Sequence, residues 1–174
     1  NKHYASIENL PLGDFYFIAF GNDDLKIIGY VNPDPKSKKI KIGNRKIVKT
    51  NIGKAYLNDK KTICDVISEV DDAANTSIFN GKAIISCNNK NKFFGSWFQQ
   101  GGKGEGIGIN VNNKGTKLNF YFVKNKSAAK RLKNPNLQYA KKIREENETT
   151  FTPKKSIVNK APIIKVDLNK KIKK

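Results

Sequence analysis

The segment 93–123 constrains the fold of this chain more than any other, because it combines runs of aromatic residues with closely spaced glycines. It reads FFGSWFQQGGKGEGIGINVNNKGTKLNFYFV, and the turn signals GGKG and NNKG divide it into three extended runs. Aromatic residues fall on both faces of the first run, and the glycines of the second leave room for Trp97 or a neighbouring backbone. The pattern predicts a meander of three antiparallel strands over residues 93–100, 105–111 and 116–123, with Trp97 buried.

The GGKGEGIG stretch within this segment combines glycine and lysine, as phosphate-binding loops do. A Walker loop, however, needs a lysine followed by Ser or Thr at the start of a helix, so that aligned N–H groups meet the phosphate. Here Lys103 is followed by Gly104 and then by a predicted strand. The glycine spacing also differs from that of a dinucleotide-binding loop. We therefore interpret the stretch as a structural hairpin.

Strand signals dominate the first 125 residues, where β-branched and aromatic runs alternate with turn residues. Further strands are predicted at residues 14–20, 25–31, 38–50 (a hairpin around Gly43), 53–59 and 82–87. The stretch 60–72 instead predicts a helix, because Ile63, Val66, Ile67 and Val70 recur at helical spacing and Asn58 could cap it. The β-branched residues in this stretch weaken that prediction.

The expected fold class is mainly β (α+β): an antiparallel β-meander in a barrel- or sandwich-like domain, with one or two short helices. A chain of 174 residues suffices for about one domain with a sizeable core. We divide it into a β-rich domain (1–125), short basic helices (126–148) and a basic extended tail (149–174). No apolar run approaches the ~18 residues that a transmembrane helix requires, so we expect no membrane span.

The two cysteines, Cys64 and Cys87, lack the CxxC spacing of a zinc site, and the single histidine, His3, is distant in sequence. We favour a disulfide between them over two buried thiols. The chain contains no methionine, even at position 1, which we interpret as removal of a targeting segment rather than trimming of the sequence. Both inferences favour a periplasmic or extracellular location, with the cytoplasm as the alternative.

The net charge of +19 is the strongest compositional signal, with 34 basic and 15 acidic residues. A field of this size attracts polyanions such as acidic glycans, anionic lipid headgroups or nucleic acid. The alternative is a lysine-rich surface that only interacts with solvent. The residues that we predict to bind a polyanion are Lys38, Lys39, Lys41, Arg45, Lys46, Lys49, Lys130, Arg131, Lys141, Lys142 and Arg144.

The sequence carries no recognisable catalytic constellation: no G-x-S-x-G, no H-E-x-x-H and no cluster of His and Cys. The carboxylate pairs Asp23–Asp24 and Asp71–Asp72 are typical of turns, with a weak Ca²⁺ site at the second pair as the alternative. We expect no cofactor, no metal and no catalytic residue.

These observations favour a non-enzymatic, exported, β-rich accessory or binding domain whose cationic surface contacts an anionic polymer or an envelope surface. The first alternative is an intracellular nucleic-acid-binding or ribonucleoprotein component. An enzyme that acts on an anionic polymer is the third hypothesis.

Overall fold

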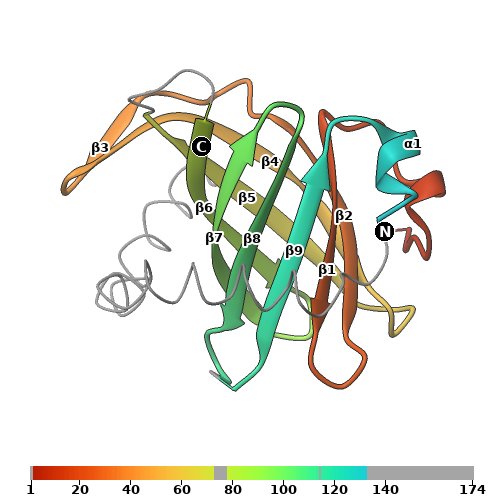
Figure 1. Cartoon of the computed structure of the whole chain (residues 1–174). Coiled ribbons are helices and arrows are strands. Elements are labelled where there is room, and N and C mark those ends of the chain that lie inside the picture. The colour runs from red at the N-terminus through yellow and green to blue at the C-terminus, as the bar shows by residue number, and fades with distance from the viewer. Residues whose placement is uncertain (1, 73–77, 114, 133–174) are drawn as a thin grey trace. The chain divides into compact units, whose positions relative to one another are not determined.

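The computed structural model describes residues 2–72, 78–113 and 115–132, in which nine strands, one 3₁₀ turn and one short helix are defined (Figure 1). The helical elements are η1 (Ile7–Asn9) and α1 (Lys126–Ala129). The strands are β1 (Phe15–Gly21), β2 (Lys26–Pro33), β3 (Ile40–Ile42), β4 (Arg45–Leu57), β5 (Ile63–Asp71), β6 (Ile78–Cys87), β7 (Lys92–Gln100), β8 (Lys103–Asn110) and β9 (Lys117–Val123).

The strands close into an antiparallel barrel, which confirms the predicted mainly β, barrel-like class. The sheet order is β2-β1-β9-β8-β7-β6-β5-β4-β3, and an additional ladder between β2 and β4 closes the ring. That ladder runs from the Ile27–Leu57 pair to the Pro33–Asn51 pair. The short β3 pairs only with β4, so it lies outside the eight-stranded ring.

The predicted meander is confirmed. β7, β8 and β9 are consecutive antiparallel strands, and Trp97 is 7% exposed. Gln100 pairs with Lys103 across a two-residue turn in which Gly101 has φ +67°, and β8 begins directly afterwards. The stretch that resembles a phosphate-binding loop is therefore a hairpin.

The predicted helix over residues 60–72 is wrong, because Ile63–Asp71 forms β5 between β4 and β6. Apolar residues occur on both faces of this strand: Val66 lines the barrel interior, and the alternate position Ile67 is also buried. Burial on both faces hides the two-residue alternation that would mark a strand and leaves an apparent helical stripe. The predicted strand 53–59 is the end of the long β4.

Apolar side chains fill two cores, one inside the barrel and one on its outer surface. The outer core forms where η1 and α1 pack against β1 and β9, and its buried members are Ile7, Leu10, Tyr16, Ile18, Ile28, Tyr56 and Ala129. The buried members of the inner core are Phe15, Phe17, Ala19, Ile27, Val31, Ala55, Leu57, Cys64, Val66, Ile85, Phe93 and Leu118.

Only the beginning of the predicted helical region 126–148 is described, and there α1 spans Lys126–Ala129. The Asn125 side chain caps this helix by accepting hydrogen bonds from the backbone N–H groups of Ser127 and Ala128. The rest of that region and the predicted tail 149–174 lie outside the described residues. Among the helices that are described, none has the length and hydrophobicity to cross a bilayer.

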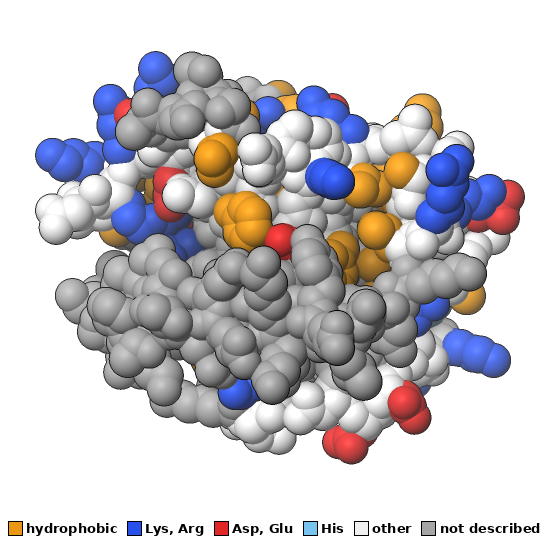
Figure 2. Space-filling view, in the orientation of Figure 1, with side chains coloured by type: hydrophobic (Ala, Val, Ile, Leu, Met, Phe, Trp, Pro, Cys, Tyr) orange, Lys and Arg blue, Asp and Glu red, His pale blue; other side chains and the backbone are white. Residues whose placement is uncertain are grey.

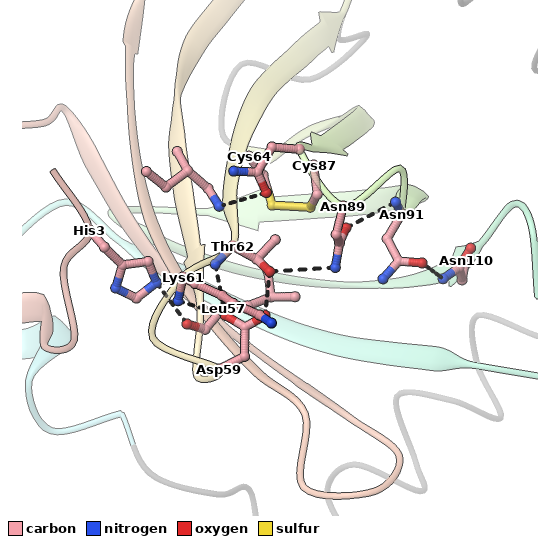
Figure 3. The surroundings of a disulfide bond; sticks show 12 residues. His3, Leu57, Asp59, Lys61, Thr62, Cys64, Cys87, Asn89, Asn91 and Asn110 are labelled. Atoms are coloured by element: carbon pink, nitrogen blue, oxygen red, sulfur yellow. Dashed lines mark hydrogen bonds between the residues drawn. A yellow bond between two sulfur atoms is a disulfide. The ribbon is translucent and has the colours of Figure 1, made fainter. Parts of the chain in front are cut away.

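The hairpin turns at one end of the barrel surround the disulfide between Cys64 and Cys87 (Figure 3). The two cysteines are direct partners on β5 and β6 with a Cα–Cα distance of 3.9 Å, slightly shorter than the ~4.4 Å lower end of the usual range. The predicted disulfide is therefore present. Side-chain hydrogen bonds from Asn110 to Asn91 (3.2 Å) and from Asn89 to Thr62 (3.5 Å) link the turns that surround it. We call this end of the barrel the closed end.

Two further contacts order the closed end. The Nε2 atom of His3 lies 2.9 Å from the Leu57 carbonyl oxygen and donates to it, so the terminal segment lies against the barrel (Figure 3). Burial raises the pKa of the Asp59 carboxyl, because it disfavours the charged form. Hydrogen bonds from the Thr62 hydroxyl and from the backbone N–H groups of Thr62 and Lys61 favour the charged form. The effect of these hydrogen bonds is larger than that of burial, so the pKa of Asp59 is lowered.

Candidate ligand cavity

The barrel interior holds a cavity of about 300 Å³. Most of its wall is apolar, contributed by inward-facing positions of all eight strands of the ring. Its lining residues are Asp14, Phe15, Phe17, Val31, Val48, Lys49, Asn51, Val66, Ser68, Val70, Phe79, Ala83, Ile85, Phe93, Gly95, Trp97, Gln99, Gly108, Leu118, Phe120, Phe122 and Lys124.

The cavity runs along the barrel interior and reaches the surface at one end. Leu57 and Cys64 belong to the inner core at the closed end and do not line the cavity. At the opposite end, Lys49 and Lys124 line it and are exposed. We call this opposite end the mouth; it lies where β1, β4, β6 and β8 begin and where β2, β5, β7 and β9 end (Figure 1).

Three aromatic rings form one wall of the cavity near the mouth. Phe122 makes edge-to-face contacts with Phe15 and with Trp97, and both pairs of ring centroids are 5.6 Å apart. The rings fit because glycines lie beneath them: a Cβ on Gly104 would collide with the Phe122 ring, and one on Gly106 with the Phe120 ring. The glycines of β8 thus admit the aromatic side chains of β9, not the indole of Trp97.

Two buried polar atoms on cavity-lining residues have no hydrogen-bond partner among the described residues. They are the Nε1 donor of Trp97 and the Oδ1 acceptor of Asn51. The two residues are only 7% and 5% exposed. Leaving such a group unpaired costs about 1–3 kcal/mol, so unpaired groups in a native fold are exceptional. Each atom is shielded from a water-sized probe, so it can contact a bound molecule only if its side chain moves.

The charged residues of the cavity lie at its mouth. Lys49 follows a register irregularity between Ile47 and Lys49 in the β4–β5 ladder. The Lys124 ammonium lies 5.3 Å from the centroid of the Phe15 ring, within the range of a cation–π interaction. Asp14 also lines the cavity, so the two lysines exceed the acidic residues of the lining by one charge.

The predicted polyanion-binding residues that are described fall into two regions. Lys38, Lys39, Lys41, Arg45, Lys46 and Lys49 lie on or near the β3–β4 hairpin, whereas Lys130 and Arg131 directly follow α1. Figure 2 shows Lys and Arg side chains projecting at the upper left, where β3 lies, and near α1. The predicted residues Lys141, Lys142 and Arg144 lie outside the described part of the chain.

Three of these basic side chains already pair with carboxylates. Arg45 contacts Glu69 (3.1 Å) and Asp71 (2.5 Å). Lys46 pairs with Asp72 at 3.6 Å, and Lys130 pairs with Glu8 at 3.0 Å. The prediction that both acidic pairs lie in turns is wrong for Asp71, which is the last residue of β5. Asp71 and Asp72 hold basic side chains, whereas Asp23 and Asp24 lie in the β1–β2 turn with positive φ, as predicted.

No group of three or more His, Cys, Asp or Glu residues that could hold a metal ion occurs within residues 2–72, 78–113 and 115–132. The cavity lining contains one carboxylate, two ammonium groups, hydroxyl and amide groups, and no histidine or cysteine. This set can hold an apolar molecule and contact a polar group at its end.

Trp97 is buried, as predicted from the sequence, but the sequence did not predict the cavity. The signal was the coincidence of large aromatics and glycines on matching faces of adjacent strands, as for Phe120 and Gly106. That signal becomes specific only once the strand register is known. The residues so found define a class: a small, closed antiparallel β-barrel with an apolar internal cavity.

No family model matches the chain, and no curated protein matches it. Two solved structures are similar in fold. One is a redesigned β-barrel, mFAP1, bound to DFHBI, which is 10% identical over 70% of this chain and 100% of that chain with a TM-score of 0.45. The other is EF1p2_mFAP2b bound to DFHBI, 9% identical over 70% of this chain and 98% of that chain, with a TM-score of 0.46. A likeness at this level carries no conclusion about what this chain binds.

Proposed function

We propose that this protein is a non-enzymatic binding barrel that takes an apolar small molecule into its interior. The observation that carries the proposal is the cavity of about 300 Å³, with its apolar wall and the unpartnered polar atoms of Trp97 and Asn51. Ligand sites are typically mostly apolar hollows of ~300–1,000 Å³ with a few well-placed polar groups.

The test uses the fluorescence of Trp97, which is the only tryptophan of the chain and lines the cavity. Titration with 1-decanol, a neutral apolar probe, should change the Trp97 emission saturably with one molecule bound per chain. The variant Ala83→Phe should abolish this change because the new ring projects from β6 into the cavity. The matched control Ala5→Phe adds the same ring at an exposed position and should bind as the wild type does.

Circular dichroism and thermal unfolding should show that Ala83→Phe remains folded. If it does not, Ser68→Leu, which also narrows the cavity, takes its place. An absence of saturable binding to the wild type, or equal binding to the folded cavity-filling variant, would contradict the proposal.

We further propose that the barrel works in an oxidising compartment, periplasmic or extracellular. The disulfide supports this proposal, because structural disulfides persist mainly outside the cytosol. Intact mass of freshly isolated protein should increase by about 2 Da on reduction, since each disulfide gains two hydrogens. Free thiols in such protein would instead favour a cytoplasmic location.

A second candidate function is contact between the cationic surface and an anionic polymer or envelope surface. It is favoured by three exposed lysines on β3 and in the loop before it: Lys38, Lys39 and Lys41. Among the described residues, the structure records no ion pair for any of the three. Lysine lacks the bidentate geometry of arginine, so such contacts should show little sequence preference.

Titration of heparin, duplex DNA and anionic vesicles at two ionic strengths tests this surface. Affinity for DNA should fall with salt by a log–log slope of about −0.9 per phosphate engaged. The variant K38Q/K39Q/K41Q should bind more weakly than the control K60Q/K61Q, which lies in the β4–β5 turn. Selective binding of nucleic acid would favour the ribonucleoprotein alternative, and cleavage of a polymer would favour an enzyme. No binding at low salt would contradict this second function.

A further inference from the structure

The size of the cavity indicates the part of a ligand that it can enclose. Its volume is about 300 Å³. One water molecule takes up ~30 Å³ in the liquid, and a methylene group is of similar size. The cavity therefore has room for at least about ten non-hydrogen atoms, the size of a single medium-length chain.

The distribution of polarity along the cavity is uneven. Val66, Ile85, Phe93 and Leu118 line it and belong to the inner core. The two lysine side chains of the lining lie at the mouth. Lys49 is on β4 and Lys124 directly follows β9, and strands β2 and β1 lie between β4 and β9 in the ring. An elongated ligand would thus meet apolar surface along its body and positive charge at one end.

Lys49 and Lys124 are available to such a ligand. Neither forms an ion pair with a described residue that the structure records, and Lys124 is held near the cavity wall by its contact with Phe15. A charge-assisted hydrogen bond to a carboxylate is stronger than one between neutral groups, and a partly apolar surrounding strengthens it further.

The unpartnered polar groups of the lining fit the same chemistry. Trp97 Nε1 is a hydrogen-bond donor, and the Asn51 amide, which carries donors as well as an acceptor, can rotate to present its Nδ2 atom. Both atoms are shielded from a water-sized probe, so each group can donate to a carboxylate, or to an oxygen substituent close to it, only after its side chain moves. No acidic side chain other than Asp14 lines the cavity to oppose an anion.

We propose that the ligand is a single-chain anionic amphiphile, a carboxylate with an apolar body of about ten non-hydrogen atoms. Its chain occupies the interior, and its carboxylate lies at the mouth within reach of Lys49 and Lys124. This inference rests on the proposed function of the cavity and adds the charge and shape of the ligand.

The test compares three probes with matched ten-carbon chains: decanoate, 1-decanol and decyltrimethylammonium. Trp97 fluorescence and isothermal titration calorimetry measure their affinity for the full chain at neutral pH. Decanoate should bind about ten-fold more tightly than decanol, although it is better hydrated, because the lysines favour its charge. The cationic probe should bind most weakly.

Charge variants identify the residues responsible. Lys49→Gln and Lys124→Gln should each weaken decanoate binding by about five-fold or more, with decanol affinity unchanged within about two-fold. The matched control Lys26→Gln replaces an exposed lysine at the start of β2, near the closed end, and should change neither affinity.

The outcomes separate this inference from the proposed function. Equal binding of all three probes, or tighter binding of decanol than of decanoate, would overturn the anionic ligand while leaving an apolar-ligand barrel. Loss of decanoate binding in Lys26→Gln to the same degree as in the mouth variants would also overturn it. If no probe binds, both proposals fail.

Discussion

The indole ring of Trp97 lies across the backbone of Gly81 on the adjacent strand. The two residues are partners in the β6–β7 ladder, and a Cβ on Gly81 would lie 2.5 Å from Cζ2 of Trp97. It would also collide with the Glu69 carbonyl oxygen of β5. Glycine at position 81 therefore makes room for the ring, and the ring becomes part of the cavity wall.

Replacing Gly81 by Ala should destabilise the fold, because both the ring and the β5 backbone would have to move. Such overpacking costs about 1–3 kcal/mol. Denaturant unfolding followed by circular dichroism measures the loss, and a shifted Trp97 emission should accompany it. The control Gly102→Ala, where a Cβ meets nothing within 4 Å, should change the free energy of unfolding by less than about 0.5 kcal/mol. Equal effects of the two substitutions would contradict this explanation.

Two asparagines that are both 5% exposed offer a comparison between an unpartnered and a bonded amide. Asn51→Leu removes the unpartnered Oδ1 and should raise the free energy of unfolding by about 1 kcal/mol, while weakening decanoate binding. Asn110→Leu should instead lower the free energy of unfolding by about 2 kcal/mol. Asn110 Oδ1 accepts from the backbone N–H groups of Asn112 and Asn113, and its Nδ2 donates to Asn91. Destabilisation of similar size by both substitutions would contradict the assignment of Asn51 to ligand binding.

The disulfide should stabilise the barrel substantially, because it connects residues 23 positions apart. In the chain-entropy model, a loop of this length contributes about 3 kcal/mol. Thermal unfolding should therefore occur at a lower temperature for Cys64→Ala/Cys87→Ala than for the wild type. A reductant should lower the midpoint of the wild type and leave that of the double variant unchanged. A midpoint insensitive to reductant in both proteins would show that the bond adds nothing to stability.

Tyr56 predicts a loss of stability at alkaline pH. Its burial, followed by the electrostatic influence of Tyr30 and Tyr4, raises the pKa of Tyr56 to about 12 from an ordinary value of about 10. A raised pKa means that the folded state favours the neutral phenol. The contribution of the neutral phenol to the free energy of unfolding is complete below about pH 10 and is lost as the pH rises from about 10 to 12.

Denaturant unfolding at pH 8, 10 and 11.5 should show this loss, which cannot exceed about 3 kcal/mol because one pKa unit corresponds to ~1.4 kcal/mol. Tyr56→Phe should remove this part of the pH dependence even if it is less stable at pH 8. A variant with the same alkaline loss as the wild type would assign that loss to other groups.

The sequence predicted the local part of the fold and missed the part that depends on distant pairing. The runs around Trp97 and Phe120, separated by glycine and asparagine turns, define their strands by themselves. Barrel closure depends on the pairing of Gly29 with Ala55, which no local pattern indicates. The wrong prediction of a helix over residues 60–72, where the structure has β5, has a related cause. Val66 and Ile67 are buried on opposite faces of the strand, which removes the alternation of apolar and polar residues that marks a strand.

The candidate site was less predictable than the fold. Exposed lysines can be counted in a sequence, but the position of Lys49 at a cavity mouth depends on the irregular register of β4 against β5. Likewise, the ion pairs that engage Arg45 join it to residues of β5, 24 and 26 positions further along the chain. Composition predicted a cationic surface, but the apolar interior and its polar atoms follow only from the closed ring.

The central claim, that a single-chain carboxylate enters the barrel, is tested most directly by a crystal structure with 10-bromodecanoate. Anomalous scattering locates the bromine independently of the protein density. The claim predicts a bromine peak inside the barrel beside Val66, Ile85 and Phe93, with the carboxylate at the mouth near Lys49 and Lys124. A bromine bound only on the outer surface at saturating ligand, or a carboxylate at the closed end, would contradict it.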